Sequence, residues 1–418
     1  MRSNLELDVP NGATGMSLRF ACAVLSVLLL GLSLWAQLPP TQRLSVEDER
    51  EFEKELERLE TLLPSANNKP VIELQIAKTY AAAGQYSEAM QRLRKLVEAN
   101  LGFDPSRDPD FARLRGTSEF QSIMDEVRRQ TPPVHNSRLI ATVSGRDVRP
   151  ENLAFDIKRH AFLLGNTATL ELVRCSSAGQ CIPLVTPKTG EKGYVLGLKV
   201  NPSADQVWAT SNTSERAGLR CYDLETGNLI RTASIQGKHV FNDLAISATG
   251  SVYVTDTAEG SVYQLSSGRT ALERIAPQHT FTAANGIAIS GDQRRLYVST
   301  WEDGIDLIDI RSGVVASMIH PDDVCLAFID GLYATHGGLI AIQNGPMLPR
   351  IVEFRTSANH SRITAIRVLE RRNPAFDGIT TGVIVGKDLY YVANPQADKQ
   401  NGMDWRPLQI FSVPVPTR

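Results

Sequence analysis

The chain has 418 residues, which exceeds what one typical domain core uses, so two or three structural units are expected. Lys and Arg number 44 and Asp and Glu number 46, giving a formal net charge of -2. Such a balance supplies no overall attraction for a phosphate backbone or an anionic lipid surface, so we expect no nucleic-acid partner. Charged residues crowd between Glu47 and Arg129, which predicts two architectures in one chain.

The first part of the chain has the pattern of a targeting segment. Arg19 precedes an uncharged apolar run at 20–34, which has the length of a signal-peptide core and is short for a membrane span. We expect residues 1–40 to direct export, to a periplasmic or secreted location. An uncleaved membrane anchor is the alternative, because Leu34 lies where a cleavage site prefers a small residue. Met16 is a second candidate start.

Residues 45–133 are predicted to form a helical segment. Between Val46 and Leu63, apolar residues recur at spacings of three and four among Glu, Lys and Arg, which indicates an amphipathic helix. A helix pair at 71–83 and 87–99 resembles the tetratricopeptide repeat in its small and aromatic residues, and a last helix is expected at 108–129. The segment is interpreted either as a surface for a protein partner or as a spacer, and we favour the spacer.

From Ser137 onward the sequence repeats itself about every 45 residues. The clearest copies begin at Asn242 and Asn285, and the weaker ones begin at Glu151, Gly197, Asp330 and Asp377. A sandwich also has short strands and Gly, Asn and Asp turns, but a fixed period of about four strands per unit indicates radial repetition. The prediction is a mainly β fold: a six-bladed β-propeller over 137–418, preceded by the α-helical, tetratricopeptide-like segment.

Two features are expected to hold the ring together. Residues 139–143 and 409–413 are suitable partners in one blade shared by both ends of the propeller. Cys175 and Cys181 bracket a short loop and are predicted to form a disulfide across a hairpin after export. The sequence has no CxxC pair and its histidines are scattered, so no zinc site is expected.

The residues that begin the innermost strands are the candidate site. In a propeller these positions face the mouth of the central tunnel, so equivalent positions of different blades converge. The chain places two carboxylates and two amides there: Glu151, Asn242, Asn285 and Asp330. Oxygen donors of this mixture suit a hard divalent cation, calcium in preference to zinc. Asn-Gly and Asp-Gly are also strong turn formers, so each residue alone has a purely structural explanation.

The turns that carry these donors resemble the ligand-bearing turns of the gluconolactonase and senescence-marker (SMP-30-like) lactonases and, more distantly, of paraoxonases. The similar stretches, in matching order and spacing, are 150–155, 241–244, 284–287 and 329–332. In that family the Glu, the two Asn and the Asp hold the catalytic metal. The resemblance therefore implies this role for Glu151, Asn242, Asn285 and Asp330. It covers about the last two-thirds of the chain and leaves the helical segment unexplained.

The resemblance implies metal-dependent hydrolysis of a lactone or a related ester, with Asp330 as the base. Trp301, Asn344 and Asp243 are expected in or beside the substrate pocket. Leu196 stands where paraoxonases have a histidine, so a histidine mechanism is not expected.

Two points stay open at this stage. His239 lies near Asn242 in sequence, and we interpret it as a solvated loop side chain. The alternative function is a non-catalytic exported propeller that serves as a binding or scaffold module, because propellers host scaffolds and enzymes alike.

Overall fold

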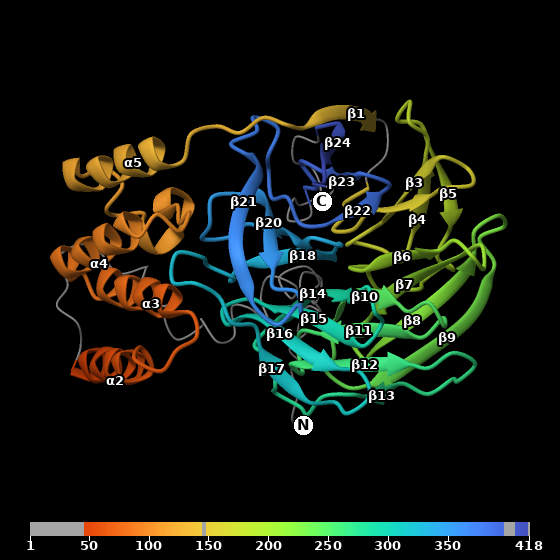
Figure 1. Cartoon of the computed structure of the whole chain (residues 1–418), viewed down its shortest axis with the longest axis horizontal. Coiled ribbons are helices and arrows are strands. Elements are labelled where there is room, and N and C mark those ends of the chain that lie inside the picture. Colours follow the sequence, from red (N-terminus) through yellow and green to blue (C-terminus); the bar gives the residue numbers. More distant parts are fainter. Residues whose placement is uncertain (1–45, 144–147, 397–405, 417–418) are drawn as a thin grey trace, which may run out of the picture.

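The computed structural model describes residues 46–143, 148–396 and 406–416, which form a helical segment beside a propeller (Figure 1). The predicted targeting segment at 1–40 lies outside the described residues. Among the helices of the described part, none is long and apolar enough to span a membrane.

The helical segment contains four α-helices and two short 3-10 turns. Their bounds are α2 (Val46–Leu62), α3 (Lys69–Ala82), α4 (Tyr86–Glu98), η2 (Pro105–Arg107), η3 (Pro109–Phe111) and α5 (Ser118–Gln130). Helix α3 begins at Lys69 and has Pro70 in its first turn, where a missing N–H costs nothing. Helices α3 and α4 pack against each other, as the predicted helix pair requires. Their likeness to a tetratricopeptide repeat stays a prediction.

The single helix predicted at 108–129 was wrong, because polar side chains interrupt it. The Asp108 carboxylate accepts a hydrogen bond from the Asp110 amide at 3.1 Å, which closes a tight turn. The Thr117 hydroxyl accepts one from the Phe120 amide at 3.2 Å and caps α5. Such side chains compete with the helical backbone bonds, so the chain forms η2 and η3 first and a regular helix only from Ser118.

The described residues from Arg138 onward form six four-stranded antiparallel sheets, which confirms the six-bladed propeller. The first blade has β2 (Ala154–Asp156), β3 (Ala161–Gly165), β4 (Leu172–Cys175) and β5 (Cys181–Val185). The second has β6 (Leu198–Asn201), β7 (Gln206–Asn212), β8 (Arg216–Asp223) and β9 (Leu229–Gln236). The third has β10 (Phe241–Ile246), β11 (Val252–Asp256), β12 (Ser261–Leu265) and β13 (Glu273–Arg274).

The fourth blade has β14 (Ala284–Ile289), β15 (Arg295–Thr300), β16 (Gly304–Asp309) and β17 (Val315–Ser317). The fifth has β18 (Ile329–Ala334), β19 (Gly338–Gln343), β20 (Arg350–Thr356) and β21 (Ile363–Arg371). The sixth has β22 (Gly382–Val385), β23 (Asp388–Val392), β24 (Leu408–Pro414) and β1 (Arg138–Val143).

The ring closes as the sequence predicted, because β1 pairs antiparallel with β24 and joins the two ends of the propeller. Apolar side chains fill the layer between neighbouring blades. Ala245 and Tyr253 of the third blade, for example, share a buried cluster with Ile287 and Val298 of the fourth. Burial of this apolar surface stabilises the ring.

The cysteines of the propeller fall into two classes. Cys175 and Cys181 face each other across β4 and β5, and their sulfur atoms form a disulfide. Cys221 and Cys325 are buried free thiols, as expected for small apolar side chains.

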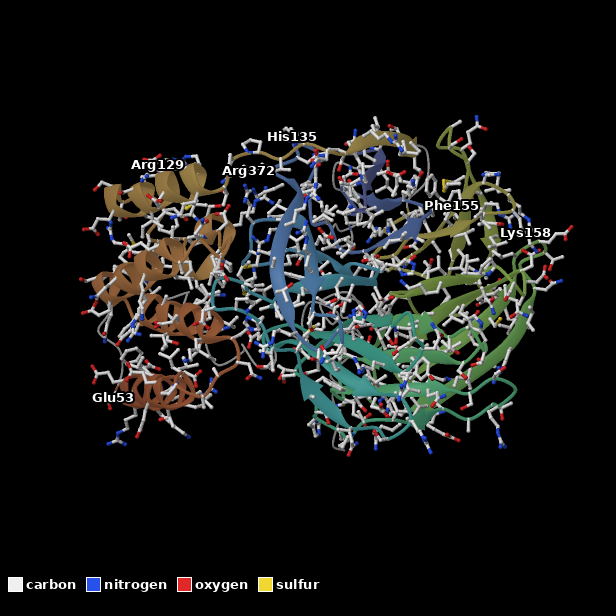
Figure 2. All side chains as sticks on the ribbon, viewed as in Figure 1. Glu53, Arg129, His135, Phe155, Lys158 and Arg372 are labelled. Carbon is white, nitrogen blue, oxygen red and sulfur yellow. A yellow bond between two sulfur atoms is a disulfide. The ribbon has the colours of Figure 1, made fainter. Side chains whose placement is uncertain are left out.

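The helical segment packs directly against the propeller. One buried apolar cluster contains Leu93 and Phe111 of the helical segment together with Phe328 and Met347 of the fifth blade. On the other side of the seam, the Arg372 guanidinium donates to the Thr131 carbonyl at 2.6 Å, beside the segment that leads from α5 to β1 (Figure 2). A spacer requires no such shared core, so the helical segment has a structural role on the propeller as well.

Candidate functional site

The predicted donors occupy equivalent places in the fold. Asn242, Asn285 and Asp330 are each the second residue of an inner strand, in β10, β14 and β18, and Glu151 lies just before β2. At each of the three strands, the pairing with the next strand has a register irregularity at the donor. Bulges of this kind change the direction of a side chain. The repeated irregularity therefore explains how three inner strands turn an oxygen-bearing side chain out of the pleat.

The Asp330 carboxylate is held by two amides. The Nδ2 atom of Asn285 donates to its Oδ1 at 2.6 Å, and the Nδ2 atom of Asn344 donates to its Oδ2. Asn344 also donates to the carbonyl of Ile379 at 2.6 Å, which ties it to the start of the sixth blade. Both amide side chains are buried. Asp330 is thus fixed in one orientation by blades four, five and six.

Of the two other donors, Asn242 is held through its side chain and Glu151 through its main chain. Asn242 donates through Nδ2 to the Thr257 hydroxyl at 3.1 Å. Because Asn242 and Asn285 both use Nδ2 as a donor, the carbonyl oxygen of each side chain is the atom left to act as a ligand. The main-chain carbonyl of Glu151 accepts from the Thr381 hydroxyl at 2.7 Å. This bond holds the first blade against the sixth beside the site.

The two carboxyl groups raise the question of charge. Burial, and then the negative charge of Asp330, raise the pKa of Glu151 to about 8. Burial also raises the pKa of Asp330 to about 6, against the opposing effect of the amide hydrogen bonds from Asn344 and Asn285. A divalent cation between the two acids would stabilise the ionised form of each carboxyl group. The two carboxylates and two amide oxygens are a donor set that fits such a cation.

Asp243 acts between blades. Its Oδ1 lies 3.3 Å from the Lys199 ammonium of the second blade, and its Oδ2 accepts from the Ile287 amide of the fourth blade at 3.3 Å. The carboxylate is almost fully buried. Asp243 therefore links three consecutive blades, and its contribution to a substrate pocket stays a prediction.

Sequence reasoning missed three residues near the site. The Lys199 ammonium lies 5.4 Å from the centre of the Tyr333 ring, whose hydroxyl accepts from the Gly382 amide at 2.5 Å. Burial and the charges of Asp243 and Asp330 raise the pKa of Tyr333. Burial and the charge of Glu151 raise the pKa of Tyr194 to about 12. The repeat itself was the available signal, because Lys199 and Tyr333 lie on inner strands and Tyr194 lies four residues before the start of β6.

Trp301 lies at the contact with the helices. Its ring meets that of Phe328 edge to face, with centroids 5.5 Å apart. It also covers Gly345, where an added Cβ would lie 2.8 Å from the indole, so a larger residue at 345 would displace the ring. The predicted pocket role of Trp301 remains a prediction, whereas its packing between propeller and helices is observed.

His239 is mostly buried, contrary to the solvated side chain that we expected. Its Nδ1 lies 2.5 Å from Oδ2 of Asp256, and Glu259 completes a cluster whose ligand atoms lie within 4.8 Å of one another. Glu259 already accepts from Arg274, and Asp256 accepts from the Val240 amide at 3.0 Å. We interpret the cluster as a hydrogen-bonded network that stabilises the third blade.

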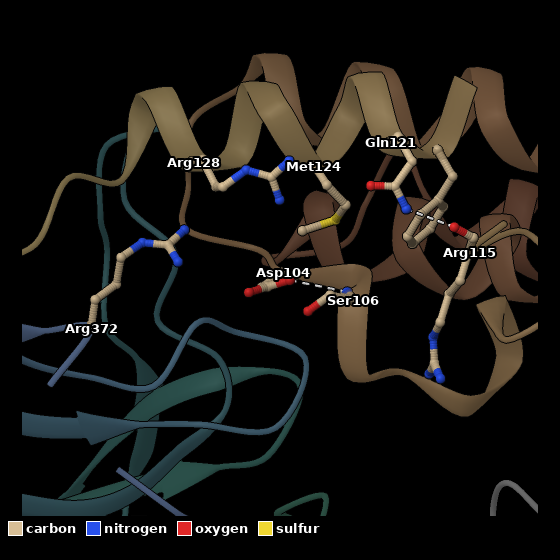
Figure 3. A pocket seen from close by; sticks show the side chains of 8 residues that line it. Asp104, Ser106, Arg115, Gln121, Met124, Arg128 and Arg372 are labelled. Atoms are coloured by element: carbon tan, nitrogen blue, oxygen red, sulfur yellow. Dashed lines mark hydrogen bonds between the residues drawn. The ribbon is translucent and has the colours of Figure 1, made fainter. Parts of the chain in front are cut away.

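A concavity lies at the seam between the helices and the propeller. This pocket of about 270 Å³ is lined by Asp104, Ser106, Arg115, Phe120, Gln121, Met124, Arg128 and Arg372. Figure 3 shows α5 above Asp104 and Ser106, with Arg372 approaching from the propeller. The four predicted donors are absent from its lining, so it is separate from the candidate cation site.

Comparisons with solved structures place this architecture among known propellers. The allergen Mala s 1 of Malassezia sympodialis is 12% identical, with a TM-score of 0.53, over 67% of this chain and 96% of that chain. This chain shares its propeller fold. A gluconolactonase from Xanthomonas campestris is 15% identical, with a TM-score of 0.49, over 68% of this chain and 91% of that chain. A PQQ-bound aldose sugar dehydrogenase from Streptomyces coelicolor is 15% identical, with a TM-score of 0.46, over 68% and 99% of the two chains.

No protein-family model matches the chain, and no curated protein sequence matches it. The similarity to Mala s 1 supports the fold alone, and the function has to be argued from the site itself.

Proposed function

We propose that the chain is a metal-dependent hydrolase that opens a lactone or a related ester at the mouth of the propeller tunnel. The observation that carries this proposal is the set of donors Glu151, Asn242, Asn285 and Asp330 at equivalent starts of inner strands, with the Asp330 carboxylate fixed by two amides. The likeness of the four turns to those of lactonases gives the same function.

Each donor has a distinct task in the proposed site. Glu151 and Asp330 balance the charge of a divalent cation, for which the all-oxygen set favours calcium. Asn242 and Asn285 contribute neutral carbonyl oxygens and hold their neighbours through Nδ2. A bound cation of this kind supplies Lewis-acid polarisation of a substrate carbonyl and lowers the pKa of water.

Asp330 is the residue to which we assign the proton transfer. Its carboxylate is already oriented by Asn285 and Asn344, and a bound cation would keep it ionised and so able to accept a proton. It would take a proton from the attacking water and return it to the leaving alkoxide as the ring opens. Asp330→Asn keeps the shape of the side chain and removes this base.

The test uses the full chain after treatment with a chelator. Calorimetry with calcium, magnesium, manganese and zinc should show one binding event per chain, and a panel of lactones and esters should show turnover that requires the metal. Asp330→Asn should abolish the turnover. The matched control is Asp377→Asn, because Asp377 begins another copy of the repeat but pairs with Arg406, with 42% of its side chain exposed.

Two outcomes separate the alternatives. If none of the four metals binds, the cation site is wrong. If a metal binds but no lactone or ester turns over, the site is structural, and the non-catalytic binding module becomes the better function.

We also propose that the chain is exported, on the support of the apolar run at 20–34 and of the Cys175–Cys181 disulfide, since disulfides persist in oxidising compartments.

A further inference from the structure

A short strap of the helical segment binds a loop of the fifth blade. Residues 101–104, between α4 and η2, pair antiparallel with the loop 344–348 that follows β19, through a β-bridge between Phe103 and Met347. The Asp104 amide donates to the Pro346 carbonyl at 3.0 Å, and the Leu348 amide donates to the Gly102 carbonyl at 2.9 Å. The strap therefore fixes the backbone of the loop whose first residue is Asn344.

A buried arginine also binds the same strap. Arg350 donates to the Leu101 carbonyl at 3.0 Å and to Oε1 of Gln343 at 2.8 Å. Gln343 in turn donates to the carbonyls of Cys325 and Ala327. At Gly102, where φ is 96°, an added Cβ would lie 2.3 Å from the Arg350 guanidinium, so this approach requires glycine. Burial lowers the pKa of Arg350 to about 10, so the buried side chain remains charged at neutral pH.

The strap reaches the candidate site by two routes. Through Met347 it holds the loop that begins at Asn344, whose side chain donates to Asp330. Through its ring, Phe103 packs edge to face on Phe328, with centroids 6.2 Å apart, two residues before Asp330 in the chain. The backbone N–H of Asn344 also donates to the Phe328 carbonyl at 3.1 Å, so the two residues that the strap supports are bonded to each other.

From these contacts we infer that the helical segment helps to set the geometry of the candidate cation site. Asn344 is the positioning residue, and the strap 101–104 is the element that holds its loop in place. This inference rests on the proposed function. Its physical basis is that groups which orient a metal ligand set metal affinity although they do not touch the metal. Asn344 can fix the Asp330 carboxylate only while its own backbone is fixed. The Asn344 backbone carbonyl accepts from the Met347 amide at 3.1 Å, and Met347 is in turn bridged to the strap.

The experiment compares two phenylalanines of the same apolar cluster in the full chain. Phe103 contacts the loop 344–348 and Phe328, whereas Phe120 is buried on α5 in the helical part of the cluster. We expect Phe103→Ala to weaken calcium binding about tenfold or more, the loss typical of a missing supporting group. Phe120→Ala should change calcium affinity less than about twofold. Phe103→Leu should recover most of the affinity, because it restores the apolar contact.

A second readout is independent of any metal. Hydrogen exchange of the peptide that covers 344–348 should accelerate in Phe103→Ala and remain unchanged in Phe120→Ala. If Phe103→Ala fails to fold, Arg350→Met replaces it, since this change keeps an unbranched side chain and removes the bonds to Leu101 and Gln343.

The outcomes distinguish this inference from the proposed function. Unchanged calcium affinity in Phe103→Ala, while the unaltered chain binds calcium, overturns the inference. If the unaltered chain binds no metal, the proposed function fails, and hydrogen exchange alone decides the strap. Faster exchange at 344–348 then supports its control of Asn344, and unaltered exchange overturns it.

Discussion

Calcium binding to the candidate site should depend steeply on pH. The cation requires ionised carboxylates, but burial raises the pKa of Glu151 to about 8 and that of Asp330 to about 6. Below pH 8 a bound proton must therefore leave for each calcium ion that binds, and below pH 6 two protons must leave. Lowering the pH should weaken calcium binding although no other part of the protein changes.

The expected magnitude follows from the number of protons displaced. One proton per ion corresponds to about tenfold in the dissociation constant per pH unit, so the constant should rise about a hundredfold between pH 8 and pH 6. Below pH 6 the dependence should steepen to about a hundredfold per unit. The two acids titrate as a pair, so these steps belong to the pair as a whole.

The assay is calorimetry at pH 8.5, 7 and 6 in buffers with different ionisation enthalpies, which counts the protons released. Glu151→Gln should bind calcium more weakly throughout and lose the dependence between pH 6 and 8. A dissociation constant that stays flat over this range, with no proton release, would refute either the raised pKa values or the assignment of the two carboxyl groups as ligands.

The same linkage acts on folding when calcium is withheld. The pKa of Glu151 is raised from 4.5 in the unfolded chain to about 8 in the folded protein. The folded protein therefore holds the proton more tightly, and the resulting stability is complete below pH 4.5 and is lost as the pH rises through 8. Saturating calcium should remove this loss, and thermal melts at pH 6 and 8.5, with and without calcium, measure it. A melting temperature that calcium raises equally at both pH values would contradict this reasoning.

Three further predictions address other parts of the molecule. Asn285→Ala should weaken calcium affinity about tenfold without unfolding the blades, because it removes a neutral ligand and leaves the charge balance intact; an unaltered affinity in calorimetry would exclude Asn285 as a ligand. The exported protein should carry Cys175 and Cys181 in the oxidised form, and Cys181→Ser should cost about 2 kcal/mol in a denaturant titration; alkylation of both thiols without prior reduction would disprove the disulfide. A fragment of residues 137–418 should remain a closed propeller but self-associate, because it exposes the apolar surface around Phe328; a monodisperse fragment in light scattering would argue against this.

The propeller could be predicted because its information is local and repeated. Each blade carries the same alternation of short apolar strands and turn residues, so six copies of one pattern fixed the number of blades and the positions of the inner strands. The donors followed from the same repeat, since residues at equivalent positions of a closed ring converge on its axis. Closure by β1 and β24 was predictable for the same reason, because an incomplete blade at each end of the chain must be completed by the other end.

Only the tertiary structure decided what meets between distant parts of the chain. The strap residue Phe103 pairs with Met347 and packs on Phe328, and nothing in the helical pattern near 103 specifies a partner so far along the chain. His239 is buried against Asp256 because the turn before β10 folds back onto the end of β11. Local periodicity determines which face of an element is apolar, but packing determines which other surface covers it. For this protein, that packing joins a helical segment of unremarkable sequence to the residue that orients Asp330.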